Sequence, residues 1–274
     1  MASRNVSDRT RLSDDQLQEM MKLIKGADSV ELKLTVPDDQ HRATIISMQM
    51  DPVEAQLRQV FFFDTPDLAL DAAGVVVRAR RIAGGRGDTV VKLRPVVPDD
   101  LDSELRKNPA FNVEVDAMPG GYVASGSFKG TTTGATVNDA VAGKTALRKI
   151  FSKGQREFFR QHAPEGIDLD SLVPLGPTFI LKGKFEPAEL PRRFVLELWL
   201  YQDGSRVMEL STKCLPNEAF QVAAEARALL ASKGVSVSGA QTTKTRTALE
   251  FFKNQLAEEA KAAAKSDAKQ DSPS

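Results

Sequence analysis

The chain has 274 residues and no formal net charge at neutral pH, because 37 lysines and arginines balance 37 aspartates and glutamates. This balance excludes the overall basic excess of a general nucleic-acid-binding protein, so recognition of an anion depends on local placement of charge. One cysteine excludes an internal disulfide, and two histidines cannot form a multi-histidine zinc site. A metal would therefore be held by carboxylates, which favours Mg or Mn.

The N-terminal residues are polar. Residues 1–11 lack the apolar core of a signal peptide, and no apolar run approaches the roughly 20 residues needed to span a bilayer. We therefore expect a cytoplasmic protein with no membrane partner and no nucleic-acid partner.

The expected elements begin with a short helix in an N-terminal extension of residues 1–28. Ser13 and Gln16 have the spacing of a capping box, and apolar residues follow at helical spacing. Runs of two-residue alternation then predict strands at 29–36, 44–50, 59–63, 75–82, 88–95, 111–117, 178–186, 192–201 and 206–213. So many short strands favour a barrel or a sandwich. The Asp203-Gly204 pair predicts an antiparallel hairpin between the last two strands.

Other segments depart from this alternation. Residues 118–136 are rich in Gly, Ser and Thr, which is typical of a loop, whereas residues 137–162 have an apolar face at helical spacing. Two more helices are predicted at 217–233, which Gly234 would end, and at 242–261. Without an internal repeat or a linker, the sequence favours one domain over 29–261. The Ala, Lys and Ser content of 262–274 predicts a disordered tail.

Charged residues gather on one face of most predicted strands. Alternate side chains of a strand point to the same face, so the charges can be sorted by parity. Seven strands then have one charged and one apolar face. The charged faces carry doublets of one sign, which are Arg78 with Arg80, Lys92 with Arg94, and Lys182 with Lys184.

This charged face has two interpretations. On the outside of a sandwich it would form cross-strand ion pairs worth only about 0.2–1 kcal/mol each. Basic doublets, however, repel each other unless an anion lies among them. A phosphate chain fits, because Arg offers a fork to two phosphate oxygens and a divalent metal can join carboxylates to the same phosphates. We therefore favour a barrel whose interior is charged.

Three stretches resemble the CYTH family of triphosphate tunnel metalloenzymes. FFFDTPDLALDAAGVVVRARR, residues 61–81, is similar to its strand, Asp-Thr-Pro turn, short helix, Gly and Arg-x-Arg strand. DTVVKLRP at 88–95 resembles its Lys-x-Arg strand, and SVELKLTV at 29–36 resembles its opening strand. The resemblance implies an α+β fold, with a closed antiparallel eight-stranded barrel that is flanked by helices and binds Mg or Mn. The family includes class IV adenylyl cyclases, thiamine triphosphatases and inorganic triphosphatases.

The resemblance also implies roles for individual residues. We expect Glu31, Lys33 and Glu114 to be catalytic, and in our leading hypothesis a remaining carboxylate such as Glu114 orients the attacking water. The metal ligands would be Glu31, Glu197 and Glu209. Lys244 and Arg246, in the stretch TTKTRTAL, would face the tunnel mouth. The implied phosphate contacts are Lys33, Arg78, Arg80, Lys92, Arg94, Lys182, Lys184, Lys244 and Arg246.

The chain departs from the family pattern at two positions. Ser29 stands where the first strand of the family begins with Glu, and Ser211 stands where a late Glu-x-Glu strand has its second Glu. Since the affinity of a hard cation depends on the number of carboxylates, these changes would weaken metal binding unless Glu114 or Asp116 compensates.

The leading hypothesis is metal-dependent hydrolysis of a triphosphate, with a small molecule that contains a triphosphate as partner. One alternative is a class IV-type adenylyl cyclase, which makes cyclic AMP from ATP. Another is a noncatalytic module that binds polyphosphate or a nucleotide. The apolar outer faces of the barrel need cover, which the predicted helices or a homodimer would provide.

Overall fold

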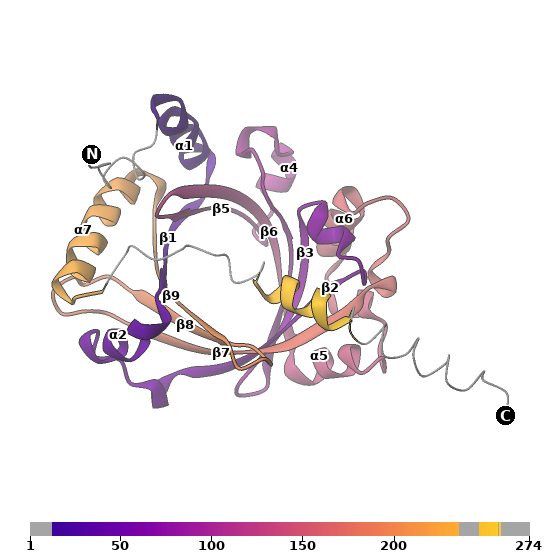
Figure 1. The fold of residues 1–274 in the computed structure, drawn as a ribbon. Helices are drawn as coiled ribbons and strands as arrows, with labels where there is room; N and C mark the ends of the chain where they lie inside the picture. The colour runs from indigo at the N-terminus through magenta and orange to yellow at the C-terminus, as the bar shows by residue number, and fades with distance from the viewer. Residues whose placement is uncertain (1–12, 236–246, 257, 259–274) are drawn as a thin grey trace, which may run out of the picture.

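The computed structural model describes residues 13–235, 247–256 and 258. In this part of the chain nine strands form one closed barrel, with helices packed around it (Figure 1). The strands are β1 (Ser29–Val36), β2 (Gln56–Asp64), β3 (Val75–Ile82), β4 (Arg86–Leu93), β5 (Phe111–Met118), β6 (Gly121–Thr133), β7 (Val173–Phe185), β8 (Phe194–Leu200) and β9 (Arg206–Cys214).

The order of strands around the barrel is β1-β5-β6-β4-β3-β2-β7-β8-β9, and β9 pairs with β1 to close it. All pairs are antiparallel apart from β1 and β5. The closed α+β barrel expected from the resemblance is therefore confirmed, with nine strands in place of eight and with one parallel pair. The hairpin at Asp203-Gly204 joins β8 to β9 in the antiparallel register expected.

The loop predicted at 118–136 is wrong, because residues 121–133 form β6 between β4 and β5. Its small residues reflect close packing rather than irregular backbone. A Cβ atom at Gly126 would lie 2.7 Å from the Phe111 ring, and one at Gly130 would lie 2.5 Å from Oε1 of Gln155. These glycines let an aromatic ring and a helix approach the strand, at the entropic cost that glycine carries in a sheet.

The strand predicted at 44–50 is also wrong, because His41–Ser47 form helix α2. Its β-branched residues gave the alternation that suggested a strand. The buried positions are His41, Thr44 and Met48, whose spacing is helical. Packing of this face against the barrel therefore overrides the local strand propensity.

The expected first helix is confirmed as α1 (Asp14–Gly26), with the capping box of Ser13 and Gln16 formed. The single helix expected at 137–162 is three pieces, α5 (Gly134–Val141), the 3-10 helix η5 (Leu147–Ile150) and α6 (Lys153–His162), because Gly143 takes a left-handed φ of 70° and breaks it. The helix expected at 217–233 is α7 (Ala219–Ser232). Short helices α3 (Ala69–Ala72) and α4 (Ser103–Arg106) complete the set of labelled α-helices.

Helices cover the apolar outer faces of the barrel on two sides, as Figure 1 shows. One apolar cluster joins β3–β6 to α1, α5 and α6, and includes Val77, Val113 and Phe158. A second joins β1, β8 and β9 to α7 through Leu34, Leu210 and Leu229, among others. Burial of these faces outside leaves the charged faces inside.

Residues 247–256 form a further helix, drawn in yellow beside the barrel opening in Figure 1. Leu249 and Phe252 pack in an apolar cluster with Val60, Phe62 and Trp199. These three strand residues lie on the inner faces of β2 and β8. One end of the interior is therefore apolar and is covered by this helix. No helix among the described residues has the length and hydropathy to cross a membrane.

Candidate functional site

The barrel encloses a cavity of about 920 Å³. Nine basic and six acidic side chains line it, and all but Lys129 and Lys149 come from the strand faces that parity assigned to the interior. The basic residues are Lys33, Arg78, Arg80, Lys92, Arg94, Lys129, Lys149, Lys182 and Lys213, and the acidic residues are Glu31, Asp88, Glu114, Asp116, Glu197 and Glu209.

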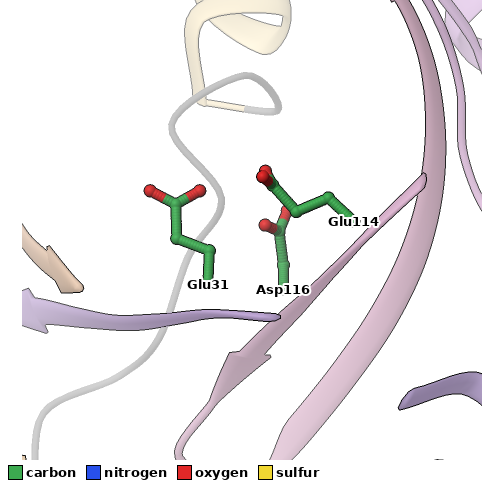
Figure 2. A group of neighbouring side chains, drawn as sticks. All are labelled: Glu31, Glu114 and Asp116. Carbon is green, nitrogen blue, oxygen red and sulfur yellow. The ribbon is translucent and has the colours of Figure 1, made fainter. Parts of the chain in front are cut away.

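Three of these carboxylates form a compact acidic cluster. Glu31, Glu114 and Asp116 each have an oxygen within 4.8 Å of the others, and Figure 2 shows their side chains converging. The parallel pairing of β1 with β5 creates the cluster, since its register sets Glu31 opposite Asp116 and Ser29 opposite Glu114. This geometry follows from a strand pairing that the sequence pattern did not predict.

Cations surround Asp116, whose side chain is only 1% exposed. Lys33 Nζ lies 2.7 Å from its Oδ1, Arg94 lies 3.4 Å and Lys92 4.0 Å from its Oδ2. Burial would raise the pKa of Asp116, but these three cations outweigh burial and lower this pKa to about 2. Burial would likewise lower the pKa of Lys33, but attraction to Asp116 and Glu31 raises it. Both groups are therefore charged at neutral pH.

Glu114 reaches the acidic cluster from the position beside Ser29. Its Oε2 accepts a hydrogen bond of 3.4 Å from the Ser29 hydroxyl and contacts Lys213 Nζ. Its Oε1 accepts no hydrogen bond from the residues that the structure describes. A carboxylate from β5 therefore lies next to the position where the CYTH pattern has a glutamate on β1.

The acidic cluster fits a divalent cation by two criteria. Its ligand atoms are carboxylate oxygens, which hard cations such as Mg and Mn prefer. Both oxygens of Asp116 are buried, and the cations of Lys33, Arg94 and Lys92 lie 2.7, 3.4 and 4.0 Å from them. Glu31, Glu114 and Asp116 are therefore the described residues best arranged to hold a metal.

A basic wall made of Arg78 and Arg80 lies on β3, and Arg58 on the neighbouring β2 lies outside the cavity lining. Arg80 Nε pairs with Asp88 at 2.7 Å, and Arg58 bonds to Gln56. Arg78 has no ion pair within the described part of the chain, and its Nε is buried without a hydrogen-bond partner. Burial, together with repulsion from Arg80, lowers the pKa of Arg78 to about 10. The guanidinium stays protonated at neutral pH and is available to an anion.

The family-implied metal ligands Glu197 and Glu209 lie opposite each other on β8 and β9. Glu197 accepts a bond of 2.8 Å from Lys182 and one of 3.2 Å from the Trp199 indole. Both glutamates line the cavity, but neither belongs to the compact group of Glu31, Glu114 and Asp116. Their roles as metal ligands stay a prediction.

The Asp-Thr-Pro turn has a structural part in this site. Asp64 is buried and accepts hydrogen bonds from the backbone amides of Thr65, Leu70 and Asp71, which fixes α3 between β2 and β3. Gly74 then begins the approach to β3 with a φ of 75°. A Cβ atom there would lie 2.4 Å from the Arg94 carbonyl oxygen, so glycine permits the close approach of β3 to β4.

Most of the residues implied by the resemblance share this cavity. Lys184 is the exception among those described, because it is exposed and does not line the cavity. Lys244 and Arg246 lie outside the described residues. Sequence reasoning assigned no role to Lys129, which lies on the strand mistaken for a loop, or to Arg58, which precedes the predicted start of its strand. The side chains at 123, 125, 127 and 129 would share one face of a strand. This two-residue spacing was the signal that could have placed Lys129 inside the barrel.

Comparisons with known proteins bear on the fold alone. No family model and no curated protein matches the chain. A solved structure from Hippeastrum, reported as a proposed adenylyl cyclase with a dominant triphosphatase activity, matches with a TM-score of 0.58 at 16% identity, over 77% of this chain and 91% of that one. A proposed adenylate cyclase from Bacillus halodurans matches with a TM-score of 0.56 at 14% identity, over 80% and 97%. The resemblance to the CYTH family is thereby confirmed at the level of the fold.

Proposed function

We propose that the chain binds a triphosphate inside the barrel and hydrolyses it with a divalent metal. The observation that carries the proposal is Arg78, a half-buried cation with a buried Nε and no ion-pair partner among the described residues, in a cavity that also contains the acidic cluster. Nine cations against six carboxylates leave an excess of positive charge in the cavity. A phosphate chain would neutralise that excess, and a metal would join the chain to the carboxylates.

The basic wall and the acidic cluster would have different functions, since the first would bind phosphate and the second would hold the metal. Arg78 and Arg80 would bind phosphate oxygens with their forked guanidinium groups, and Lys182 would add a point charge beside them. Glu31 and Asp116, together with Glu114 Oε2, would hold the metal, which supplies a Lewis acid for the phosphoryl oxygens when bound. Glu114 Oε1 would accept the proton of the attacking water, because no described residue donates a hydrogen bond to it.

Release of phosphate and pyrophosphate tests the proposal. Tripolyphosphate, thiamine triphosphate and ATP would each be incubated with Mg, with Mn and with EDTA. We expect metal-dependent release of orthophosphate, lost in EDTA and reduced at least about a hundredfold in Glu31→Ala. Binding without turnover in either metal would contradict the hydrolytic part and favour a binding module. Pyrophosphate and cyclic AMP from ATP would instead favour the cyclase.

A matched control separates loss of the metal site from loss of fold. Glu54 is an exposed acid that does not line the cavity, so Glu54→Ala should retain the wild-type rate. Binding of tripolyphosphate in EDTA, measured by calorimetry, should also persist in Glu31→Ala, because the basic wall is intact. A Glu31→Ala variant that loses binding as well as turnover would contradict these separate functions of the basic wall and the acidic cluster.

A further inference from the structure

The cavity continues beyond the acidic cluster and the basic wall to the barrel rim. Its lining there includes Thr131, Thr132, Lys149 and Ser152. At about 920 Å³ the cavity is near the upper end of the roughly 300–1,000 Å³ range of sites for drug-sized ligands. The opposite end is covered by the apolar cluster around Phe252, so a ligand that extends past the inner site would extend toward this rim.

The outer part of the cavity is held in place by one buried side chain, Gln155 of α6. Its amide nitrogen donates 3.1 Å hydrogen bonds to the carbonyl oxygens of Thr89 and Phe128, and its Oε1 accepts from the backbone amide of Ser152. The missing side chain at Gly130 makes room for it. These bonds attach the turn between η5 and α6 to β4 and β6, and so fix the backbone beside Lys149 at the rim.

Two lysines lie at this rim without an ion-pair partner among the described residues. Lys129 lies on the inner face of β6, opposite Val90, and Lys149 lies on η5. Neither forms an ion pair with any residue that the structure describes. Desolvation lowers the pKa of Lys129, and attraction to Glu114 offsets part of this effect, while repulsion from Lys213 and Arg78 adds to it. Like charges gathered at one mouth are unfavourable without a counter-anion.

We propose that Lys129 and Lys149 form an outer anion site that binds a fourth phosphate, so that the ligand is a linear polyphosphate of four or more phosphates. The inference rests on the proposed function, because it assumes that the inner residues hold the first three. An ammonium group is a point donor that suits a terminal or bridging phosphate without demanding one orientation.

The lining of the outer part favours phosphate over a nucleoside. A base would need an aromatic face to stack on, at about 1–3 kcal/mol per base. Phe151 is the aromatic residue among the described residues of this part, and it is only 2% exposed because it packs in the core. The rim also carries the hydroxyls of Thr131, Thr132 and Ser152 and the two ammonium groups, which donate hydrogen bonds to phosphate oxygens, while Asp88 opposite Thr131 is paired with Arg80.

Calorimetry with tripolyphosphate, tetrapolyphosphate and ATP, in EDTA to prevent turnover, tests this site. We expect the wild type to bind tetrapolyphosphate about tenfold more tightly than tripolyphosphate, as one or two added charge-assisted hydrogen bonds provide. Lys149→Ala and Lys149→Glu should erase that preference and leave tripolyphosphate affinity within about twofold. Lys153→Ala is the matched control, because Lys153 is exposed, four residues away and outside the cavity lining, and it should keep the preference.

The outcomes separate this inference from the proposed function. Equal affinity of the wild type for the two polyphosphates, or a preference that survives in both Lys149 variants, would overturn the outer site alone. ATP that binds more tightly than tetrapolyphosphate would overturn it in favour of a nucleoside at the rim. A wild type that fails to bind even tripolyphosphate would overturn both the outer site and the proposed function.

Discussion

Lys33 and Asp116 form an ion pair of 2.7 Å across the parallel strands β1 and β5, at a carboxylate that is 1% exposed. The same ammonium lies 3.2 Å from Glu31. The ion pair therefore links the opening strand of the barrel to the acidic cluster, and both of its partners line the candidate site. The same charged side chains therefore hold β1 to β5 and line the candidate site.

Replacement of Asp116 by Asn should destabilise the protein. The change removes the common partner of Lys33, Lys92 and Arg94, so that Lys33 keeps only Glu31 while Lys92 and Arg94 lose their ion pair among the described residues, and breaking such a network typically costs about 3–5 kcal/mol. Urea unfolding followed by circular dichroism would measure the loss. Asp139→Asn, at an acid that forms none of these ion pairs, is the control and should change the free energy of unfolding by less than about 0.5 kcal/mol. An Asp116→Asn variant as stable as that control would refute the assigned ion-pair network.

The lowered pKa of Asp116 predicts how the free energy of unfolding depends on pH. The pKa of Asp116 is lowered to about 2 in the folded protein, against an ordinary value near 3.9 in the unfolded chain. Its contribution is therefore fully present above about pH 4 and is lost as the pH falls toward 2, and amounts to about 2 kcal/mol. Urea unfolding between pH 3 and 6 should show a smaller decline in Asp116→Asn than in the wild type. Parallel curves for the two proteins would be the contrary result.

Replacement of Arg78 should weaken triphosphate binding more than replacement of a peripheral lysine. Loss of a buried charge that pairs with a ligand costs about 2–5 kcal/mol, so Arg78→Ala should raise the Kd of tripolyphosphate at least about thirtyfold. Arg78→Lys should recover part of that loss, because it restores the charge without the fork. Lys184→Ala should stay within about twofold, since Lys184 does not line the cavity. A similar loss of affinity in Arg78→Ala and Lys184→Ala would show that binding depends on the overall positive charge of the protein rather than on Arg78.

Glu114 should replace the carboxylate that Ser29 does not supply. Glu114→Ser should weaken Mn binding at least about tenfold, because the number of carboxylates sets the affinity for a hard cation. The exchange variant Ser29→Glu with Glu114→Ser should restore it to within about threefold, since the two positions are opposite each other in register. Titration followed by electron paramagnetic resonance reports bound Mn without any need for turnover. An exchange variant as weak as the single variant would exclude the compensation.

The inward face of the barrel could be predicted because strand parity depends only on the chain. Arg78, Arg80, Lys92, Arg94, Lys33 and Lys182 all line the cavity as the alternation placed them. The Asp-Thr-Pro turn is equally local, since Asp64 binds amides within seven residues of itself. Patterns that arise within one strand or one turn are visible in the sequence.

The acidic cluster depended on information that no local pattern contains. Glu31 and Asp116 meet because β1 pairs with β5 in parallel, and that pairing is decided by the whole barrel. Lys129 was hidden by glycines that serve distant partners, Phe111 and Gln155, rather than the strand itself. Long-range packing also turned residues 41–47 into a helix in spite of their β-branched side chains.

The most direct measurement is a crystal structure of the protein with Mn and a non-hydrolysable imidotriphosphate. We expect an anomalous Mn peak at coordination distance from Glu31 and Asp116, with phosphate oxygens in contact with Arg78. A triphosphate bound outside the barrel, or a Mn ion at Glu197 and Glu209 with none at the acidic cluster, would contradict this expectation.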